Sequence, residues 1–182
     1  MRQLAHLVHD SIGHLVADQS LNVLAREAAR GIVIEESKIL LMYTERYDDF
    51  SFPGGGIDAG EAPIVGLRRE LAEEAGAHDI EILSDFGRVT EYLPCWKPQW
   101  DLMFQTSYWF HCKLNSALQA NKLEHYEVAN GMNVHWVDID EAIRHNQSVI
   151  VSRAEKMGIS IHRETQVLQQ VAKELMGTEE SL

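Results

Sequence analysis

Residues 55–77 read GGIDAGEAPIVGLRRELAEEAGA, and the chemically informative residues of the chain are concentrated in this stretch. Pro63 near its start and Gly76 near its end are typical boundary residues of a helix, so they predict a helix over residues 62–75. Three acidic residues fall within an arc of roughly 100° on this helix, because successive residues are about 100° apart. They are Glu70, Glu73 and Glu74.

The three glutamates are electrostatically unfavourable on an isolated helix. Like charges at these spacings destabilise a helix by a few tenths of a kcal/mol each, and the macrodipole disfavours negative charge in the C-terminal half. A bound divalent cation would offset both effects. Because carboxylates are hard oxygen ligands, the sequence predicts Mg²⁺, with Mn²⁺ as a substitute. The alternative is a solvated acidic face of the helix.

Glycines accompany the glutamates at the positions where the backbone must be approached closely. Gly66 lies one turn before Glu70, although a glycine inside a helix costs about 1 kcal/mol. The run from Gly54 to Gly56 lets the backbone turn tightly and present carbonyl oxygens to a metal. Arg69 adjoins the glutamates and is expected to pair with one of them or with Glu61.

The remaining chain alternates between strand and helix patterns. Apolar and β-branched runs predict strands, and apolar residues at three- and four-residue spacing predict helices. The expected strands cover residues 28–34, 38–43, 78–91 (with a turn), 102–114 and 132–137. The other expected helices cover residues 3–25, 139–145 and 160–176, and a loop is expected over residues 92–101. This mixture indicates an α/β or α+β fold with a mixed sheet.

The full pattern of residues 55–77 resembles the Nudix box, the signature of the Nudix hydrolases. The matching residues are Gly55, Glu61, Arg69, Glu70, Leu71, Glu73, Glu74 and Gly76. Only Ala77 departs from the pattern, since it is smaller than the usual closing aliphatic residue. The resemblance implies an αβα sandwich with a mixed sheet over about residues 25–145. An amphipathic helix at residues 1–24 and a helical extension at residues 146–182 would flank this domain.

The resemblance also implies an activity: Mg²⁺-dependent hydrolysis of a nucleoside diphosphate linked to another moiety, with ADP-ribose or a nucleotide sugar as candidate substrates. Metal ions would neutralise the diphosphate, polarise phosphorus and activate a water for attack. Glu70, Glu74 and the carbonyl of Gly54 would bind the metal. Glu73 would bind a further metal, or orient or deprotonate the water. The supporting residues, which would hold the loop and the helix in register, are Arg69, Glu61 and Gly55.

Candidates outside the box carry weaker signals. Glu127 is a hypothetical general base or extra ligand, with a solvated turn as the alternative. Trp96 and Trp100 are candidates for stacking on a base of the substrate, with packing against a neighbouring element or subunit as the alternative. Arg46 is a candidate contact for a phosphate. Arg26 and Arg30 are candidates for the same role, and a surface ion pair is the alternative for all three arginines.

The amino-acid composition argues against some classes of binding partner. With 16 basic and 28 acidic residues, the net charge of -12 argues against non-specific binding to nucleic acid. No apolar run is long enough for a membrane span. Two cysteines are too few for a disulfide scaffold, so we expect free thiols and a cytoplasmic setting. A homodimer would bury the apolar faces of the two terminal helices.

The box predicts metal chemistry and leaves the substrate open. Nucleoside triphosphates, dinucleoside polyphosphates, capped RNA or a prenyl diphosphate suit the same helix, because loops outside it set selectivity. A Nudix-like domain that senses a nucleotide without cleaving it is the alternative of a different class. The presence of all three glutamates favours the enzyme.

Overall fold

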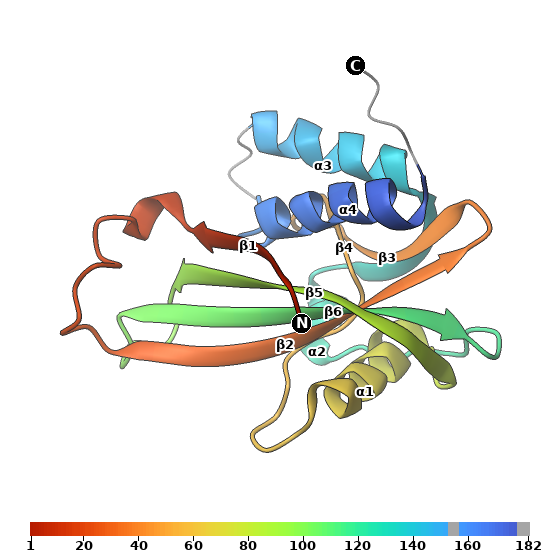
Figure 1. The fold of residues 1–182 in the computed structure, drawn as a ribbon, viewed down its shortest axis with the longest axis horizontal. Coiled ribbons are helices and arrows are strands. Elements are labelled where there is room, and N and C mark those ends of the chain that lie inside the picture. The colour runs from red at the N-terminus through yellow and green to blue at the C-terminus, as the bar shows by residue number, and fades with distance from the viewer. Residues whose placement is uncertain (153–156, 178–182) are drawn as a thin grey trace.

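The computed structural model describes residues 1–152 and 157–177, which form one mixed sheet with helices on both faces (Figure 1). The strands are β1 (Gln3–Val8), β2 (Val23–Glu35), β3 (Lys38–Thr44), β4 (Asp49–Ser51), β5 (Ile80–Pro94), β6 (Leu102–Leu114) and β7 (Met132–Asp138). The helices are α1 (Pro63–Ala75), α2 (His125–Ala129), α3 (Ile139–Ser152) and α4 (Ile161–Leu175), with a short 3-10 turn at Asp10–Ile12. The expected α+β class with a mixed sheet is confirmed.

The strand order is β1-β5-β6-β2-β3-β4, with β7 pairing on β3. The pairs β1–β5 and β2–β6 are parallel, whereas β5–β6, β3–β4 and β3–β7 are antiparallel. The two central strands β2 and β6 are paired from Val23 opposite Leu102 to Val33 opposite Cys112. Their length makes this pair the frame on which the loops around α1 are held.

Helices cover both faces of the sheet. Figure 1 shows α1 below the sheet, and α3 and α4 above it. Leu67 and Leu71 of α1 pack in a fully buried cluster with Ala29 and Val33 of β2. On the other face, the core under α3 and α4 includes Trp109 of β6. The apolar burial on each face, at roughly 25 cal/mol per Å², holds the helices on the sheet.

The predicted N-terminal helix is wrong. Residues 3–8 form β1, which runs parallel to β5 at the edge of the sheet and is followed by turns. Leu4, Ala5 and Leu7 pack on the core below α4, while His6 and Val8 are exposed. The apolar spacing within these six residues fits a helix as well as a strand. Pairing with the distant strand β5 makes the segment a strand.

Other expected elements are close to those observed. The strand at residues 102–114 is confirmed as β6, and the last helix is confirmed as α4. The helix expected over residues 139–145 continues to Ser152, so the domain boundary drawn after residue 145 falls inside α3. β5 reaches Pro94 and takes the first residues of the expected loop 92–101. In residues 1–152 and 157–177, no helix has the length and apolarity needed to cross a bilayer.

Candidate active site

The loop from Pro53 to Gly56 connects β4 to the start of α1 and is fastened to β2. The amide of Gly31 donates to the Pro53 carbonyl at 2.9 Å, and the amide of Ala29 donates to the Gly55 carbonyl at 2.9 Å. Gly54 has a φ of 127°, and a Cβ there would lie 2.2 Å from the carbonyl oxygen of Ala29. Only glycine fits this close approach, as the glycine run predicted.

Glu74 joins α1 to this loop. Its carboxylate accepts a hydrogen bond of 2.6 Å from the amide of Gly54, and the residue is only 5% exposed. The pKa of Glu74 is raised to about 8, chiefly by burial; Arg30 and the Gly54 amide lower this pKa, and the neighbouring Glu127 and Glu70 raise it. A buried carboxylate with a raised pKa next to other carboxylates is a position where a cation would be stabilising.

Arg69 connects the loop, Glu61 and Glu70. Its Nη2 donates to the Gly56 carbonyl and to Glu61 Oε2, both at 2.9 Å, and its Nη1 donates to Glu70 Oε1 at 2.6 Å. Hydrogen bonding to Glu61 raises the pKa of Arg69, so the guanidinium stays charged. The carboxylate of Glu70 also lies against Gly55, where a Cβ would be 2.3 Å from its Oε2.

Glu73 and Glu127 occupy different environments. Glu73 has a side chain that is 43% exposed and lies 3.7 Å from Arg69 Nη1. Glu127 is only 3% exposed, so the solvated turn considered for it is wrong. Its Oε2 accepts from the amide of Glu124 at 2.6 Å as part of the N-terminal capping box of α2. Tyr126 donates to its Oε1 at 3.2 Å.

Two arginines of β2 approach the loop from the side of the sheet under α4. Nη1 of Arg30 donates to the carbonyls of Phe52 and Gly54. Its Nε is buried and has no hydrogen-bond partner among the described residues. The Arg26 guanidinium lies 3.3 Å from the position of a Cβ on Gly56 and donates to Gln105 at 2.8 Å. Burial, together with Arg30 and Arg163, lowers the pKa of Arg26. The surface ion pair considered for these two arginines is therefore wrong.

The aromatic loop after β5 contributes one residue to this region. Trp96 is 63% exposed, and its ring lies 5.9 Å from the guanidinium carbon of Arg26. Trp100 is half-buried at the end of the same loop. Arg46 lies elsewhere: its Nη1 donates to Asn130 at 3.0 Å and its guanidinium lies over the ring of Tyr47. In the described part of the chain, no hydrogen bond or ion pair joins Arg46 to the box.

The donor set fits a divalent cation. Glu70 and Glu74 both lie against the Gly54–Gly55 backbone, and all candidate ligands are oxygens, which Mg²⁺ and Mn²⁺ prefer. Among residues 1–152 and 157–177, no group of three or more acidic, histidine or cysteine side chains is already arranged to hold a metal. Arg69 pairs with Oε1 of Glu70, whereas Oε2 of the same carboxylate lies beside Gly55.

Residues 25–156 match the family model described as the NUDIX domain. The chain belongs to the Nudix hydrolase family. The match begins at residue 25, where we expected the Nudix domain to begin, and it includes all of α3 instead of ending at residue 145. The division of the chain into three segments remains a prediction.

Curated relatives of this Nudix chain match it over part of their length. An RNA pyrophosphohydrolase of Helicobacter pylori (strain G27) is 51% identical over 43 residues, which cover 24% of this chain and 28% of the relative. An RNA pyrophosphohydrolase of Aliivibrio fischeri (strain MJ11) is 38% identical over 93 residues, which cover 46% of this chain and 55% of the relative. The chain therefore matches about half of these relatives or less.

A solved Nudix hydrolase from Nitrosomonas europaea shares the fold. Its TM-score is 0.56 at 18% sequence identity, and the alignment covers 85% of this chain and 96% of that one. At this identity the likeness concerns the fold alone. Together with the family match, it confirms the expected Nudix architecture for this chain.

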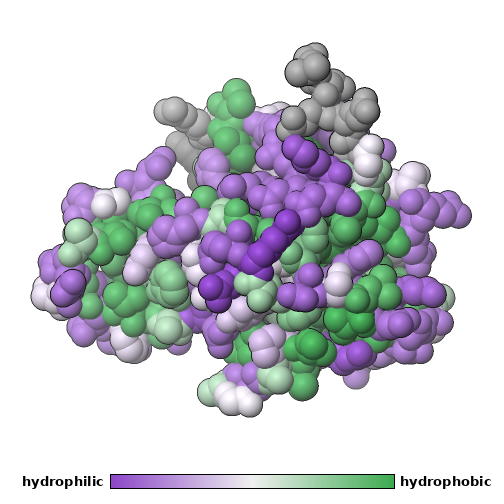
Figure 2. Space-filling view, viewed as in Figure 1, coloured by the Kyte–Doolittle hydropathy of each residue, from purple (hydrophilic) through white to green (hydrophobic). Residues whose placement is uncertain are grey.

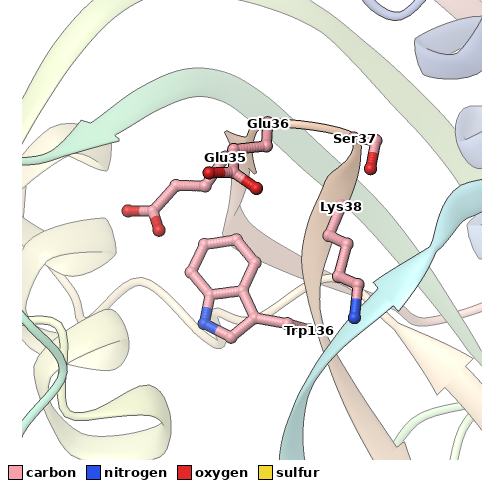
Figure 3. Close-up of a pocket in the computed structure, with 5 residues that line it drawn as sticks. All are labelled: Glu35, Glu36, Ser37, Lys38 and Trp136. Carbon is pink, nitrogen blue, oxygen red and sulfur yellow. The ribbon is translucent and has the colours of Figure 1, made fainter.

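A separate cavity of about 370 Å³ lies at the turn between β2 and β3 (Figure 3). Trp136 borders it, together with two glutamates of the turn and the side chain of Lys38. The two glutamates are Glu35 and Glu36, and Ser37 is the fifth lining residue. No residue of the Nudix box lines this cavity, so it is not part of the candidate active site.

Proposed function

We propose that this Nudix chain hydrolyses the diphosphate linkage of a nucleoside diphosphate joined to another moiety, with ADP-ribose and nucleotide sugars as the first candidates. The observation that supports this most directly is the placement of Glu70 and Glu74 against the backbone of Gly54 and Gly55. Two carboxylates and a carbonyl at one loop are a suitable oxygen site for Mg²⁺ or Mn²⁺ beside a phosphate.

Glu70, Glu74 and the Gly54 carbonyl would hold the divalent ion. When bound, the ion would neutralise phosphate charge and lower the pKa of a water molecule. Arg69 keeps the loop and α1 in register through Gly56 and Glu61. Its pairing with Glu70 Oε1 also holds that carboxylate at the loop.

The reaction is written as attack of water at phosphorus. The water oxygen forms the new bond to phosphorus, the bridging P–O bond breaks, and its electron pair leaves with the released phosphate group. Glu73 and Glu127 are the two candidates to accept the proton of the water. Glu127 lies close enough to Glu74 to raise its pKa, and Glu73 is the more exposed of the two.

The substrate would extend from the loop toward β2. Arg26 and Arg30 place positive charge there within an acidic chain, and the buried Nε of Arg30 is an available donor. Trp96 offers an exposed ring beside Arg26 for stacking on a nucleobase. Arg46 and Trp100 remain weaker candidates for contact with the substrate.

A second candidate is the 5′ end of an RNA. It is favoured by the relatives named RNA pyrophosphohydrolase, of which the chain matches 28% and 55% of the length in the two examples above. Because the net charge is -12, we expect any such contact to be limited to the terminal nucleotides.

The test is a panel of substrates incubated with Mg²⁺ and with Mn²⁺. It includes ADP-ribose, nucleotide sugars, dinucleoside polyphosphates, nucleoside triphosphates, and capped and triphosphorylated RNA. We expect one class to be cleaved, and we expect E70Q and E74Q to lower kcat at least 100-fold. The matched control is E81Q, an exposed glutamate of β5.

Comparison of E73Q with E127Q then identifies the proton acceptor as the residue whose substitution lowers kcat more while binding of the substrate is retained. If no member of the panel is cleaved but one binds wild type and E70Q equally, the chain is a nucleotide sensor and the proposed hydrolysis is wrong.

The structure removes one argument for the expected homodimer, namely the need to bury the apolar face of the last helix, α4. Val167, Leu168 and Val171 of α4 are fully buried against the sheet of the same chain. On the face seen in Figure 2, the surface over α4 is largely hydrophilic. Homodimerisation therefore remains a proposal, which light scattering at micromolar concentration tests. The cytoplasmic setting is also a proposal.

A further inference from the structure

Two adjacent residues of α4, Arg163 and Glu164, are buried at 3% and 1% exposure. Nη2 of Arg163 donates to Glu164 Oε1 at 2.8 Å, and Nη1 of Arg163 donates to Glu91 of β5. One guanidinium is thus enclosed by two carboxylates, all of them buried. Replacing such groups by apolar residues often leaves stability unchanged or improves it, so burial alone does not explain them.

The first end of this triad reaches the loop of the active site. The second oxygen of Glu164, Oε2, accepts a hydrogen bond of 3.1 Å from the amide of Phe52. Phe52 is fully buried and lies two residues before Gly54, whose carbonyl is a candidate metal ligand. Glu164 therefore holds the loop from the α4 side, while Glu74 holds it from the α1 side through the amide of Gly54.

The second end of the triad reaches the arginine beside Trp96. Glu91 lies opposite Gln105 in the β5–β6 pair, and Gln105 Nε2 lies 3.5 Å from Glu91 Oε1. The Oε1 of Gln105 accepts the 2.8 Å hydrogen bond from Nη1 of Arg26. A continuous path of polar contacts thus runs from Arg163 through Glu91 and Gln105 to Arg26.

We infer that Arg163 and Glu164 are positioning residues, through which α4 sets the geometry of both the metal-binding loop and Arg26. This inference rests on the proposed hydrolase function. α4 lies outside the residues 25–156 that match the family model. Groups that orient metal ligands without touching the metal typically change metal affinity or activity 10–100-fold when they are removed.

The loop end is tested with E164Q. Arg163 and Phe52 donate to different oxygens of Glu164, and glutamine replaces one of these oxygens by an NH2 donor. The remaining oxygen is expected to face the charged guanidinium of Arg163, so the acceptor for the Phe52 amide is lost. We expect the dissociation constant of Mn²⁺ alone, measured by electron paramagnetic resonance, to rise at least 10-fold. Hydrogen exchange of the Phe52 amide should accelerate at least 10-fold, while exchange of the Gly31 amide, which is bonded to Pro53, should not change.

The arginine end is tested with E91Q, which keeps the shape of the side chain and leaves Arg163 paired with Glu164. We expect this variant to stay folded and to raise KM at least 10-fold with a smaller change in kcat. The matched control for both variants is E174Q, which breaks an exposed ion pair of α4 with Arg2. E174Q should behave as wild type in every measurement.

The inference is overturned if both variants keep the wild-type Mn²⁺ constant and KM, including the case in which only their melting temperatures fall. Failure of the proposed hydrolysis would be recognised separately. In that event wild type would bind Mn²⁺ and cleave nothing, and the Mn²⁺ and amide-exchange comparisons of E164Q with E174Q would still decide whether α4 positions the loop.

Discussion

Glu74 is the residue whose environment makes the sharpest prediction about pH. Its pKa is raised from 4.5 to about 8, chiefly by burial. Between those values the folded chain keeps a proton that the unfolded chain has released. The free energy of unfolding of the metal-free protein must therefore fall as the pH rises through this range. A divalent cation reverses the penalty by binding the ionised carboxylate, so metal affinity should rise over the same range.

The comparison of wild type with E74Q isolates this effect from that of Asp49, whose pKa burial raises to about 7. In EDTA at pH 8 we expect E74Q to be the more stable protein, by up to a few kcal/mol. The difference should nearly vanish at pH 5, as measured by urea unfolding. Parallel pH profiles for the two proteins would show that Glu74 titrates normally.

Trp96 is predicted to act on binding of the substrate alone. Stacking of a base on an aromatic ring contributes about 1–3 kcal/mol, so W96A should raise KM roughly 10-fold or more with little change in kcat. W96F should retain most of the affinity because it keeps a ring. W136F, at the separate cavity between β2 and β3, is the control. A loss of affinity in W100A but not in W96A would assign the role to the other tryptophan of the loop.

The residues of the site differ in how visible they are in the sequence. Glu70, Glu73 and Glu74 are found because their spacing along one helix is local and their repulsion is unfavourable without a ligand. Arg163 and Glu164 stand at the start of an amphipathic helix, where charged residues are usually solvated. Their burial depends on strands β5 and β6 lying beneath that helix, which no local pattern of the sequence reveals.

At the scale of elements, the end of α1 is fixed by a glycine that cannot be replaced. Gly76 has a φ of 68°, and a Cβ there would lie 1.9 Å from the carbonyl oxygen of Gln119. Gly60 also has a positive φ, of 81°, but has no atom within 4 Å of such a Cβ. Alanine in place of Gly60 would therefore meet only the strain of a positive φ, whereas alanine in place of Gly76 would also collide with the backbone of Gln119.

We expect G60A to cost about 1–2 kcal/mol of unfolding free energy, the usual penalty of a side chain in the left-handed region. G76A should cost at least about 2 kcal/mol more, because the backbone at Gln119 must move away from the end of α1. Urea unfolding of the two variants measures the difference. Equal losses of unfolding free energy in G60A and G76A would mean that the backbone around Gln119 moves away from α1 at no measurable cost.

The elements also show which parts of the fold are predictable. β6 and α4 were found because their apolar periodicity persists over 13 and 15 residues. The six residues of β1 are too few for the apolar pattern to distinguish a strand from helical turns, and only the pairing with β5 makes the distinction. α3 was drawn too short because the polar residues His145 and Asn146 interrupt its pattern. Asn146 is in fact buried and bonds both backbone groups of Phe50.

The whole molecule carries a net charge of -12, and its carboxylates repel one another in the compact state. The screening length falls from about 10 Å at 0.1 M salt to about 3 Å at 1 M. In EDTA at pH 8 we expect the melting temperature to rise by several degrees as NaCl increases over this range. At pH 5, close to the isoelectric point of about 5.1, the net charge is small and the rise should be smaller. An equal rise at both pH values would point to a general salt effect instead of charge repulsion.

The parallel pairing of β2 with β6 has a consequence for how the chain folds during synthesis. Val23 is paired with Leu102, so β2 is synthesised well before β6 and cannot form this pair until β6 has been made. The intervening segment takes roughly 4–16 s to translate at about 5–20 residues per second. During that interval β2 is an exposed, unpaired strand edge, and contacts between distant segments slow its closure further. The same long strand that carries Arg26 and Arg30 is therefore exposed to aggregation and to capture by chaperones on the nascent chain.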